Sequence, residues 1–98
     1  MLKKSTIKGA DQVKVTFVLS ADHPHVAAAS VVGDFNGWDP DANKLVKRRN
    51  DTYSTAVKLD KGKRYAFRYY AEGNWFNDDD ADGYIFNEHG SQNCIVET

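Results

Sequence analysis

Two tryptophans, Trp38 and Trp75, stand at the ends of polar turns and are the side chains of this sequence best placed to contact a ligand. The first follows Asn36-Gly37, a strong two-residue turn signal, and the second follows Glu72-Gly73-Asn74 at the end of an aromatic stretch. A tight turn lies at the surface, so a tryptophan beside it is expected to be partly exposed. The two indoles could therefore form one apolar platform.

A pair of flat, uncharged indole rings suits the apolar faces of sugar rings. Amide and basic side chains nearby would then bond the sugar hydroxyls, an amide as donor and acceptor and a basic group as donor. Arg68, on the aromatic stretch before Trp75, and an asparagine late in the chain meet that requirement. These residues favour a binding face over a catalytic centre.

The stretch Arg64–Tyr70 has a superficial likeness to the aromatic, basic strand that binds single-stranded RNA in some proteins. That strand carries a glycine where this sequence has Arg64, and it is backed by two long helices. The chain has 13 basic and 14 acidic residues, a net charge of −1, and no long helical pattern. We therefore expect no nucleic-acid partner.

Two short stretches resemble fragments of metal sites. Asp78–Gly83 places carboxylates at the first, third and fifth positions of a calcium loop, but the twelfth position is His89 rather than a bidentate glutamate. His23 and His25 are separated by a proline and have no further ligand nearby. We expect a solvated acidic loop, a pair of loop histidines, and neither a metal site nor a cofactor.

The sequence lacks the signs of an enzyme. No carboxylate stands in a recognisable catalytic context, no serine or cysteine nucleophile motif occurs, and 98 residues are too few to surround most substrates. The single cysteine, Cys94, precedes Ile95 and Val96 and is expected to be a small buried apolar residue. We predict no catalytic residues.

Length and composition indicate a single domain, residues 1–98, with room for one modest core. Residues 1–11 carry Lys3 and Lys4 but no apolar run, so we expect neither a signal peptide nor a membrane span. We expect this segment to be loosely attached. A cytoplasmic protein without a membrane partner is the default expectation.

Alternating apolar residues predict several short strands. The clearest runs are residues 13–19 and 53–59, and the most aromatic run places Tyr65, Phe67 and Tyr69 on the expected core face. Weaker signals predict strands at residues 26–32, 44–48, 84–86 and 94–96. About six to eight short strands, with turns roughly every ten residues, are typical of an antiparallel sandwich. We therefore predict an all-β, immunoglobulin-like fold in two layers.

The residues around both tryptophans resemble the family-48 carbohydrate-binding module. This module precedes the catalytic barrel in branching enzymes and isoamylases and occurs in the β-subunit of AMP-activated protein kinase. The resemblance covers about residues 13–98, and the order and spacing of its motifs make it specific. The motifs lie at Val32–Trp38, Phe67–Trp75, Asn77–Asp78, Ala81–Tyr84 and Gly90–Asn93.

This resemblance implies an early-set immunoglobulin-like β-sandwich that binds an α-1,4-glucan. In the glycogen-binding members two tryptophans stack on glucose units, and they match Trp38 and Trp75. A lysine that bonds sugar hydroxyls is matched by Arg68, whose donors have a different geometry. An asparagine on the final strand matches Asn93, and a neighbouring hydroxyl residue matches Ser91.

One position departs from the family pattern. His89 stands where the kinase member uses a leucine to thread the curved glucan, with Phe86 and Tyr84 as candidate substitutes. Members fused to enzymes often lack the sugar site, whereas both tryptophans are present here. We therefore expect non-catalytic binding of glycogen, starch and maltooligosaccharides. The alternative is a module that docks to a partner protein, or an accessory module of an α-glucan-active enzyme without sugar binding of its own.

Overall fold

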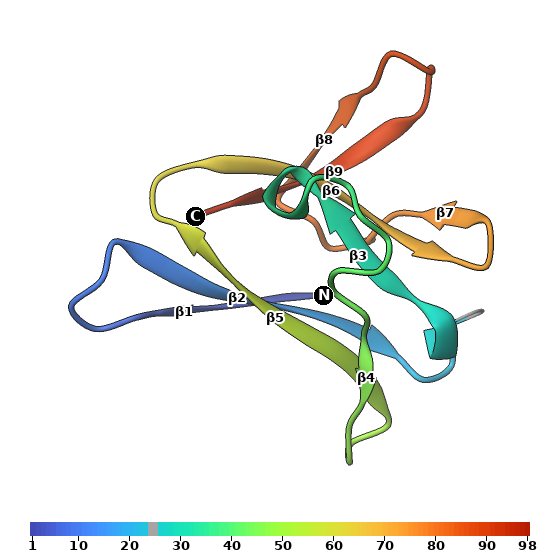
Figure 1. The fold of residues 1–98 in the computed structure, drawn as a ribbon, viewed down its shortest axis with the longest axis horizontal. Helices are drawn as coiled ribbons and strands as arrows, with labels where there is room; N and C mark the ends of the chain where they lie inside the picture. Colours follow the sequence, from blue (N-terminus) through green and yellow to red (C-terminus); the bar gives the residue numbers. More distant parts are fainter. Residues whose placement is uncertain (24–25) are drawn as a thin grey trace.

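The computed structural model describes residues 1–23 and 26–98, and these form two packed sheets (Figure 1). The strands are β1 (Leu2–Thr6), β2 (Gln12–Ser20), β3 (Ser30–Gly33), β4 (Val46–Lys47), β5 (Thr52–Asp60), β6 (Arg64–Ala71), β7 (Asn74–Phe76), β8 (Gly83–Phe86) and β9 (Gln92–Glu97). The first sheet has the order β1-β2-β5-β4, and the second has the order β3-β6-β9-β8, with β7 paired to β6. All these pairs are antiparallel, so the predicted all-β, immunoglobulin-like sandwich is confirmed.

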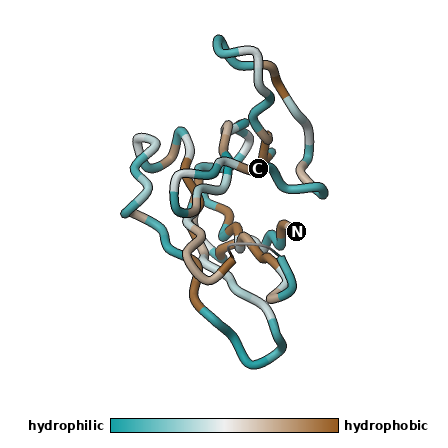
Figure 2. Tube along the Cα trace, turned by 90° about the vertical axis from the view of Figure 1, so that its right-hand side faces the viewer, coloured by the Kyte–Doolittle hydropathy of each residue, from teal (hydrophilic) through white to brown (hydrophobic). Residues whose placement is uncertain are grey.

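The core lies between the sheets, because alternating apolar residues of β2 and β6 point inward. Phe67 and Tyr69 are fully buried, whereas Tyr65 on the same face is only partly buried. Phe17 of β2 packs edge-on against Phe67, with 5.0 Å between ring centres. Figure 2 shows hydrophobic stretches mostly toward the middle of the molecule and hydrophilic stretches mostly in the loops that project from it. The side chains that alternate with Phe67 and Tyr69, such as Arg68, therefore lie on the outer face of β6.

The N-terminal segment is not loosely attached, contrary to our expectation for residues 1–11. Its strand β1 pairs with β2 from Leu2 opposite Phe17 to Thr6 opposite Val13. Backbone hydrogen bonds of a sheet need no apolar pattern, so residues 2–6 carry no local signal of this strand. Lys4 also reaches the second sheet, where its Nζ donates to Asp82 Oδ2 at 2.6 Å.

The strand predicted at residues 26–32 is shorter than expected. Val26–Ala28 form a 3₁₀ turn, in which Ala29 N donates to the Val26 carbonyl at 3.1 Å, and β3 begins at Ser30. Alanine lacks the branched side chain that favours extended backbone, so this alanine-rich stretch forms a turn instead. The weaker strand predictions at residues 44–48, 84–86 and 94–96 correspond to β4, β8 and β9.

Asp78 is buried, so the expectation of a solvated acidic loop was wrong for its first carboxylate. Its Oδ2 accepts hydrogen bonds from the Tyr69 hydroxyl and from the α-amino group of Met1, both at 2.7 Å. Its Oδ1 accepts from Asp80 N at 2.8 Å. A buried carboxylate needs such partners, because water no longer solvates it. The first position of the calcium-like loop thus anchors the fold.

Candidate functional site

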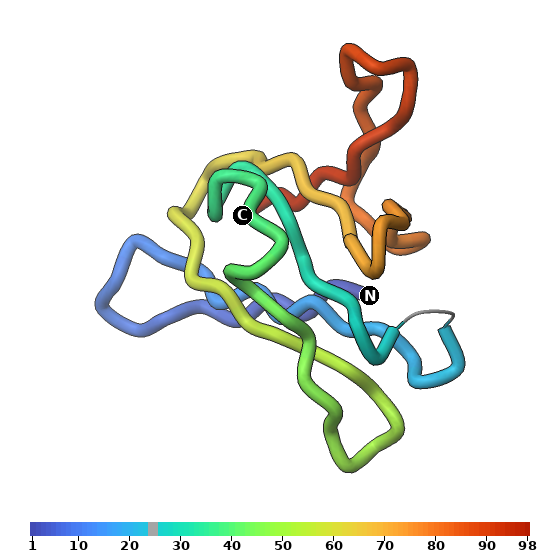
Figure 3. The backbone as a smooth tube through the Cα atoms, turned by 45° about the vertical axis from the view of Figure 1, so that its right-hand side comes forward, coloured from blue at the N-terminus to red at the C-terminus, as the bar shows by residue number. Residues whose placement is uncertain are grey.

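The outer face of the second sheet carries a groove of about 710 Å³. Its walls come from the turn after β3, from β6 and β7, and from the loop that joins β8 to β9. Figure 3 shows the β8–β9 hairpin extending beyond the rest of the chain. All the site residues proposed from the sequence line this groove: Trp38, Trp75, Arg68, Asn93, Ser91 and His89. Asp34, Ala66, Asn87 and Glu88 complete the lining.

A constrained turn presents Trp38 at one side of the groove. Gly33 ends β3, where an added Cβ would come within 2.5 Å of the Ala66 carbonyl oxygen. Asn36 Oδ1 accepts a hydrogen bond from Gly33 N at 3.0 Å and closes the turn. Gly37 and Trp38 then have φ angles of 65° and 60°, a left-handed conformation that is uncommon for tryptophan. Such strained backbone is concentrated at functional sites.

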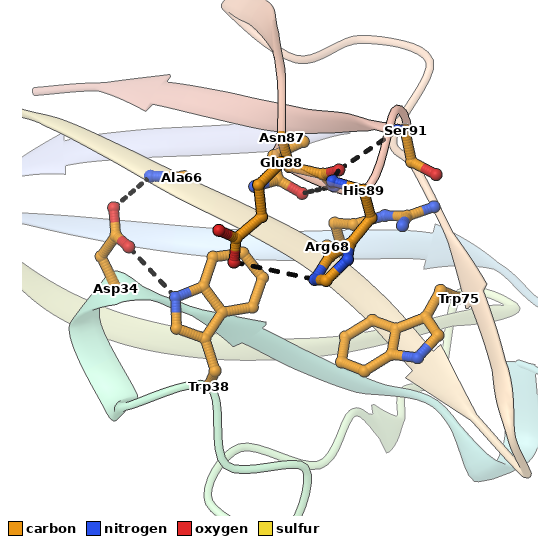
Figure 4. A pocket seen from close by; sticks show the side chains of 10 residues that line it. Asp34, Trp38, Ala66, Arg68, Trp75, Asn87, Glu88, His89 and Ser91 are labelled. Carbon is orange, nitrogen blue, oxygen red and sulfur yellow. Dashed lines mark hydrogen bonds and ion pairs between the residues drawn. The ribbon is translucent and has the colours of Figure 1, made fainter.

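Asp34 fixes the ring of Trp38. Its Oδ1 accepts a hydrogen bond from Trp38 Nε1 at 3.1 Å, and its Oδ2 accepts one from Ala66 N at 2.8 Å (Figure 4). The second bond ties the turn to β6 just beyond the last pair of the β3–β6 ladder, Gly33 opposite Phe67. Because its N–H is already bonded, the indole offers a ligand mainly apolar ring surface.

Trp75 lies on β7, which returns alongside β6 after a tight turn. Glu72 and Gly73 have φ angles of 50° and 84°, as both central residues of a type I′ hairpin turn require. The Trp75 side chain is 45% exposed, and its ring lies 4.8 Å from that of Tyr70, with 59° between the ring planes. The sequence predicted the turn, but the short strand that carries the indole was not expected.

Arg68 lines the groove on the side of Trp75 (Figure 4). Its Nε donates to Asn77 Oδ1 at 2.8 Å, and its guanidinium carbon lies 6.0 Å from the centre of the Trp75 ring. Asn77 is held in turn, because its Nδ2 donates to the Gln92 carbonyl at 2.9 Å. The terminal amino groups of Arg68 make no hydrogen bond within residues 1–23 and 26–98, so they can donate to a ligand.

The loop between β8 and β9 forms the remaining wall, and Asn87 organises it. Asn87 Oδ1 accepts from the backbone nitrogens of His89 and Ser91, at 2.9 and 3.1 Å. Its Nδ2 donates to Asn93 Oδ1 at 3.1 Å, and Asn93 itself lines the groove. His89 Nε2 lies 3.8 Å from Glu88 Oε1 at the exposed rim (Figure 4).

Cys94 lies on β9 and is fully buried, as the sequence predicted. Burial raises the pKa of its thiol to about 11. The thiol is therefore protonated at neutral pH, and a protonated thiol is a poor nucleophile.

Two other sequence-based expectations concern metals and membranes. Within the described residues, no three His, Cys, Asp or Glu side chains are grouped so that they could hold a metal ion. His25 lies outside the described residues, so the predicted pair with His23 is not tested. No helix in residues 1–23 or 26–98 is both long and apolar enough to cross a membrane.

Three polar residues support the groove but were not singled out as site residues from the sequence. Asp34 orients Trp38, Asn77 holds Arg68, and Asn87 holds Asn93. For Asp34 the sequence offered a local signal, a polar residue just before a glycine-containing turn. The partners of the other two depend on strand pairing.

An antiparallel sandwich with two tryptophans and several hydrogen-bonding groups in one open groove is the architecture of a ligand-binding module. The sequence profile of the family described as carbohydrate-binding module 48 (isoamylase N-terminal domain) matches residues 7–85. The chain belongs to this family, which confirms the resemblance found in the motifs.

Two curated relatives are each named amylopullulanase. The protein from Thermoanaerobacterium thermosulfurigenes is 34% identical over 65 residues, and the one from Thermoanaerobacter thermohydrosulfuricus is 33% identical over 66 residues. Each alignment covers 64% of this chain but only 3% or 4% of the relative. The chain therefore spans a small part of the length of these relatives.

Proposed function

We propose that this chain is a non-catalytic module that binds α-1,4-glucan chains, as in glycogen, starch and maltooligosaccharides. The observation that carries the proposal is that Trp38, from the turn after β3, and Trp75, from β7, line one groove together with Arg68 (Figure 4). Each indole would cover the apolar face of one glucose unit. An α-1,4-glucan curves, so successive glucose units can meet two rings that do not share one flat plane.

The polar side chains would fix the position of the glucan. Among the described residues, the terminal amino groups of Arg68 and the amide nitrogen of Asn93 have no hydrogen-bond acceptor, so both side chains can donate to sugar hydroxyls. Ser91 and His89 would contact the chain at the rim. The groove volume of about 710 Å³ lies within the range of small-molecule sites and is large enough for a short oligosaccharide.

The chemistry of the groove supports binding rather than catalysis. Of its two carboxylates, Asp34 already holds two N–H donors and Glu88 lies at the exposed rim. Affinity should be modest, in the micromolar to millimolar range, because the costs of association offset much of the contact energy.

Titration with maltoheptaose, followed by tryptophan fluorescence, tests this proposal. We expect a saturable change in emission, a much weaker response to cellohexaose, whose β-1,4 chain is straighter, and no reducing sugar released from glycogen. A flat response at millimolar maltoheptaose would contradict the proposal. Equal responses to both sugars would contradict the selectivity for α-glucans.

A second candidate function is docking to a partner protein, such as an α-glucan-active enzyme. The observation that favours it is the strand β8 at the edge of the second sheet, where Ile85 is 54% and Phe86 is 73% exposed. Exposed apolar edge strands are sites of association. A protein that fails to bind sugar, but loses a protein partner when Phe86 is changed to serine, would have this function instead.

A further inference from the structure

We infer that Asp34 is a positioning residue for sugar binding, because its carboxylate sets the plane of the Trp38 ring in the groove. This inference rests on the proposed function of the groove. Asp34 would thus do more than tie the turn after β3 to β6, since the residue would also act on a ligand through the indole.

The geometry gives the carboxylate two partners that differ in kind. One oxygen holds a side-chain donor, Trp38 Nε1 at 3.1 Å, and the other holds a backbone donor of the neighbouring strand, Ala66 N at 2.8 Å. The indole is thereby linked to β6, whose buried face is part of the core. The Trp38 ring, although it stands on a surface turn, is thus linked to the sheet through Asp34.

Trp38 is only half-buried, so part of its ring has no packing partner to restrict its orientation. Immobilising a tryptophan ring on binding costs conformational entropy and lowers the affinity of the protein for its ligand. A ring that is already oriented avoids this cost. Hydrogen bonds to a charged group are stronger than those between neutral groups. The Asp34 carboxylate is therefore well suited to orient this indole before a glucan arrives.

Trp75 is held differently, which makes the role of Asp34 specific. Its ring contacts the ring of Tyr70 and lies near the guanidinium of Arg68. Within the described chain its indole N–H makes no hydrogen bond. Loss of the Asp34 carboxylate should consequently disturb the Trp38 side of the groove and leave the Trp75 side intact.

Two other roles for Asp34 must be separated from positioning. The carboxylate lines the groove and could bond a sugar hydroxyl directly, or it could only stabilise the fold through Ala66. In both cases a change at Asp34 would weaken binding whether or not the Trp38 ring is present. A positioning residue acts only through Trp38, so its effect should vanish when that ring is removed.

The test is a double-mutant cycle read by calorimetric titration with maltoheptaose. Asp34→Ala should lower the affinity about fivefold to tenfold, the size of a typical lost hydrogen bond, because the bond between Trp38 and Asp34 is exposed to solvent. Asp34→Asn should lose less, because asparagine keeps one acceptor. Asp41→Ala is the matched control, since Asp41 is exposed on the same loop and its carboxylate makes no bond within the described residues. In a Trp38→Ala background, Asp34→Ala should cause no further loss.

Wild-type affinity in Asp34→Ala, or the same loss in the Trp38→Ala background, would overturn the inference. A second readout needs no sugar: hydrogen exchange of the Trp38 indole proton, followed by NMR, should be at least severalfold faster in Asp34→Ala. An unchanged exchange rate would also overturn the inference. A wild-type protein that binds no maltoheptaose would refute the proposed function separately, and this exchange measurement would still decide whether Asp34 positions the ring.

Discussion

Arg68 and Trp75 lie on paired strands, with the guanidinium carbon 6.0 Å from the centre of the indole ring. The Nε of Arg68 donates to Asn77, so the flat guanidinium is held beside the ring, while its terminal amino groups have no acceptor in residues 1–23 and 26–98. The groove therefore combines an apolar surface with donors at a fixed position. Sugar rings need both, since they have apolar faces and hydroxyl edges.

Replacing Arg68 with lysine should lower the affinity for maltoheptaose severalfold. Lysine keeps the charge, but its single ammonium group cannot bond Asn77 and also present two donors beside the ring. Calorimetric titration measures the change. Arg64→Lys is the matched control, because Arg64 is on the same strand, pairs with Glu97 and lies outside the groove lining. Wild-type affinity in Arg68→Lys would show that the donor geometry is unimportant.

Truncating either tryptophan should weaken binding much more than removing another exposed aromatic ring. Trp38→Ala and Trp75→Ala should each cost roughly 1 to 3 kcal/mol of binding free energy, as stacking on aromatic side chains does in other ligands. Phe86→Ala serves as the control, since Phe86, a candidate for contact with the glucan from the sequence, is 73% exposed and does not line the groove. Equal affinities in the three variants would show that the two indoles do not contact the sugar.

Gly33→Ala should destabilise the fold by roughly 3 kcal/mol, because an overpacked site cannot relax freely. Its new Cβ would lie 2.5 Å from the Ala66 carbonyl oxygen and 2.9 Å from Phe67 Cβ. Gly83→Ala is the matched control, where the nearest atom, Ile95 Cβ, is 3.8 Å away. Urea denaturation of both variants gives the comparison. Similar midpoints would show that the β3 turn has room for a side chain.

Much of this arrangement follows from local signals in the sequence. The turn residues before Trp38 and Trp75 predicted two partly exposed indoles, and the alternation of Phe67 and Tyr69 predicted which face of β6 is buried. These features depend on neighbouring residues alone. The sequence could therefore indicate both the sandwich and the tryptophans of the groove.

The supporting contacts could not be predicted in the same way. Asp34 bonds Ala66, and Asp78 bonds Tyr69 and the α-amino group of Met1, so each carboxylate depends on strands distant in sequence. The strand β1 likewise forms through backbone pairing rather than an apolar pattern. Contacts of this kind become visible only when the register of the sheets is known.

Stability should fall as the pH rises from 9 to 11. Burial raises the pKa of the Cys94 thiol from 9.0 to about 11, so the unfolded chain loses this proton first. The stabilising contribution of the protonated Cys94 thiol to the free energy of unfolding is therefore complete below pH 9 and is lost as the pH approaches 11. Burial, followed by the charge of Asp78, also raises the pKa of Tyr69 above its usual value of 10.0, which adds to the loss above that pH.

The Cys94→Ala variant isolates the contribution of the thiol. It retains Tyr69, so its free energy of unfolding should still fall with pH, but less steeply between pH 9 and 11 than in the wild type. Urea denaturation at several pH values measures both slopes. Parallel curves for the two proteins would mean that the thiol is not shielded from water.

The meeting of both indoles at one sugar site is tested most directly by NMR. The chain contains two tryptophans, so its spectrum has two indole N–H signals that can be followed separately during a titration with maltoheptaose. We expect both signals to shift along the same saturation curve, with one dissociation constant. A shift of only one signal, or of neither, would contradict a shared glucan groove.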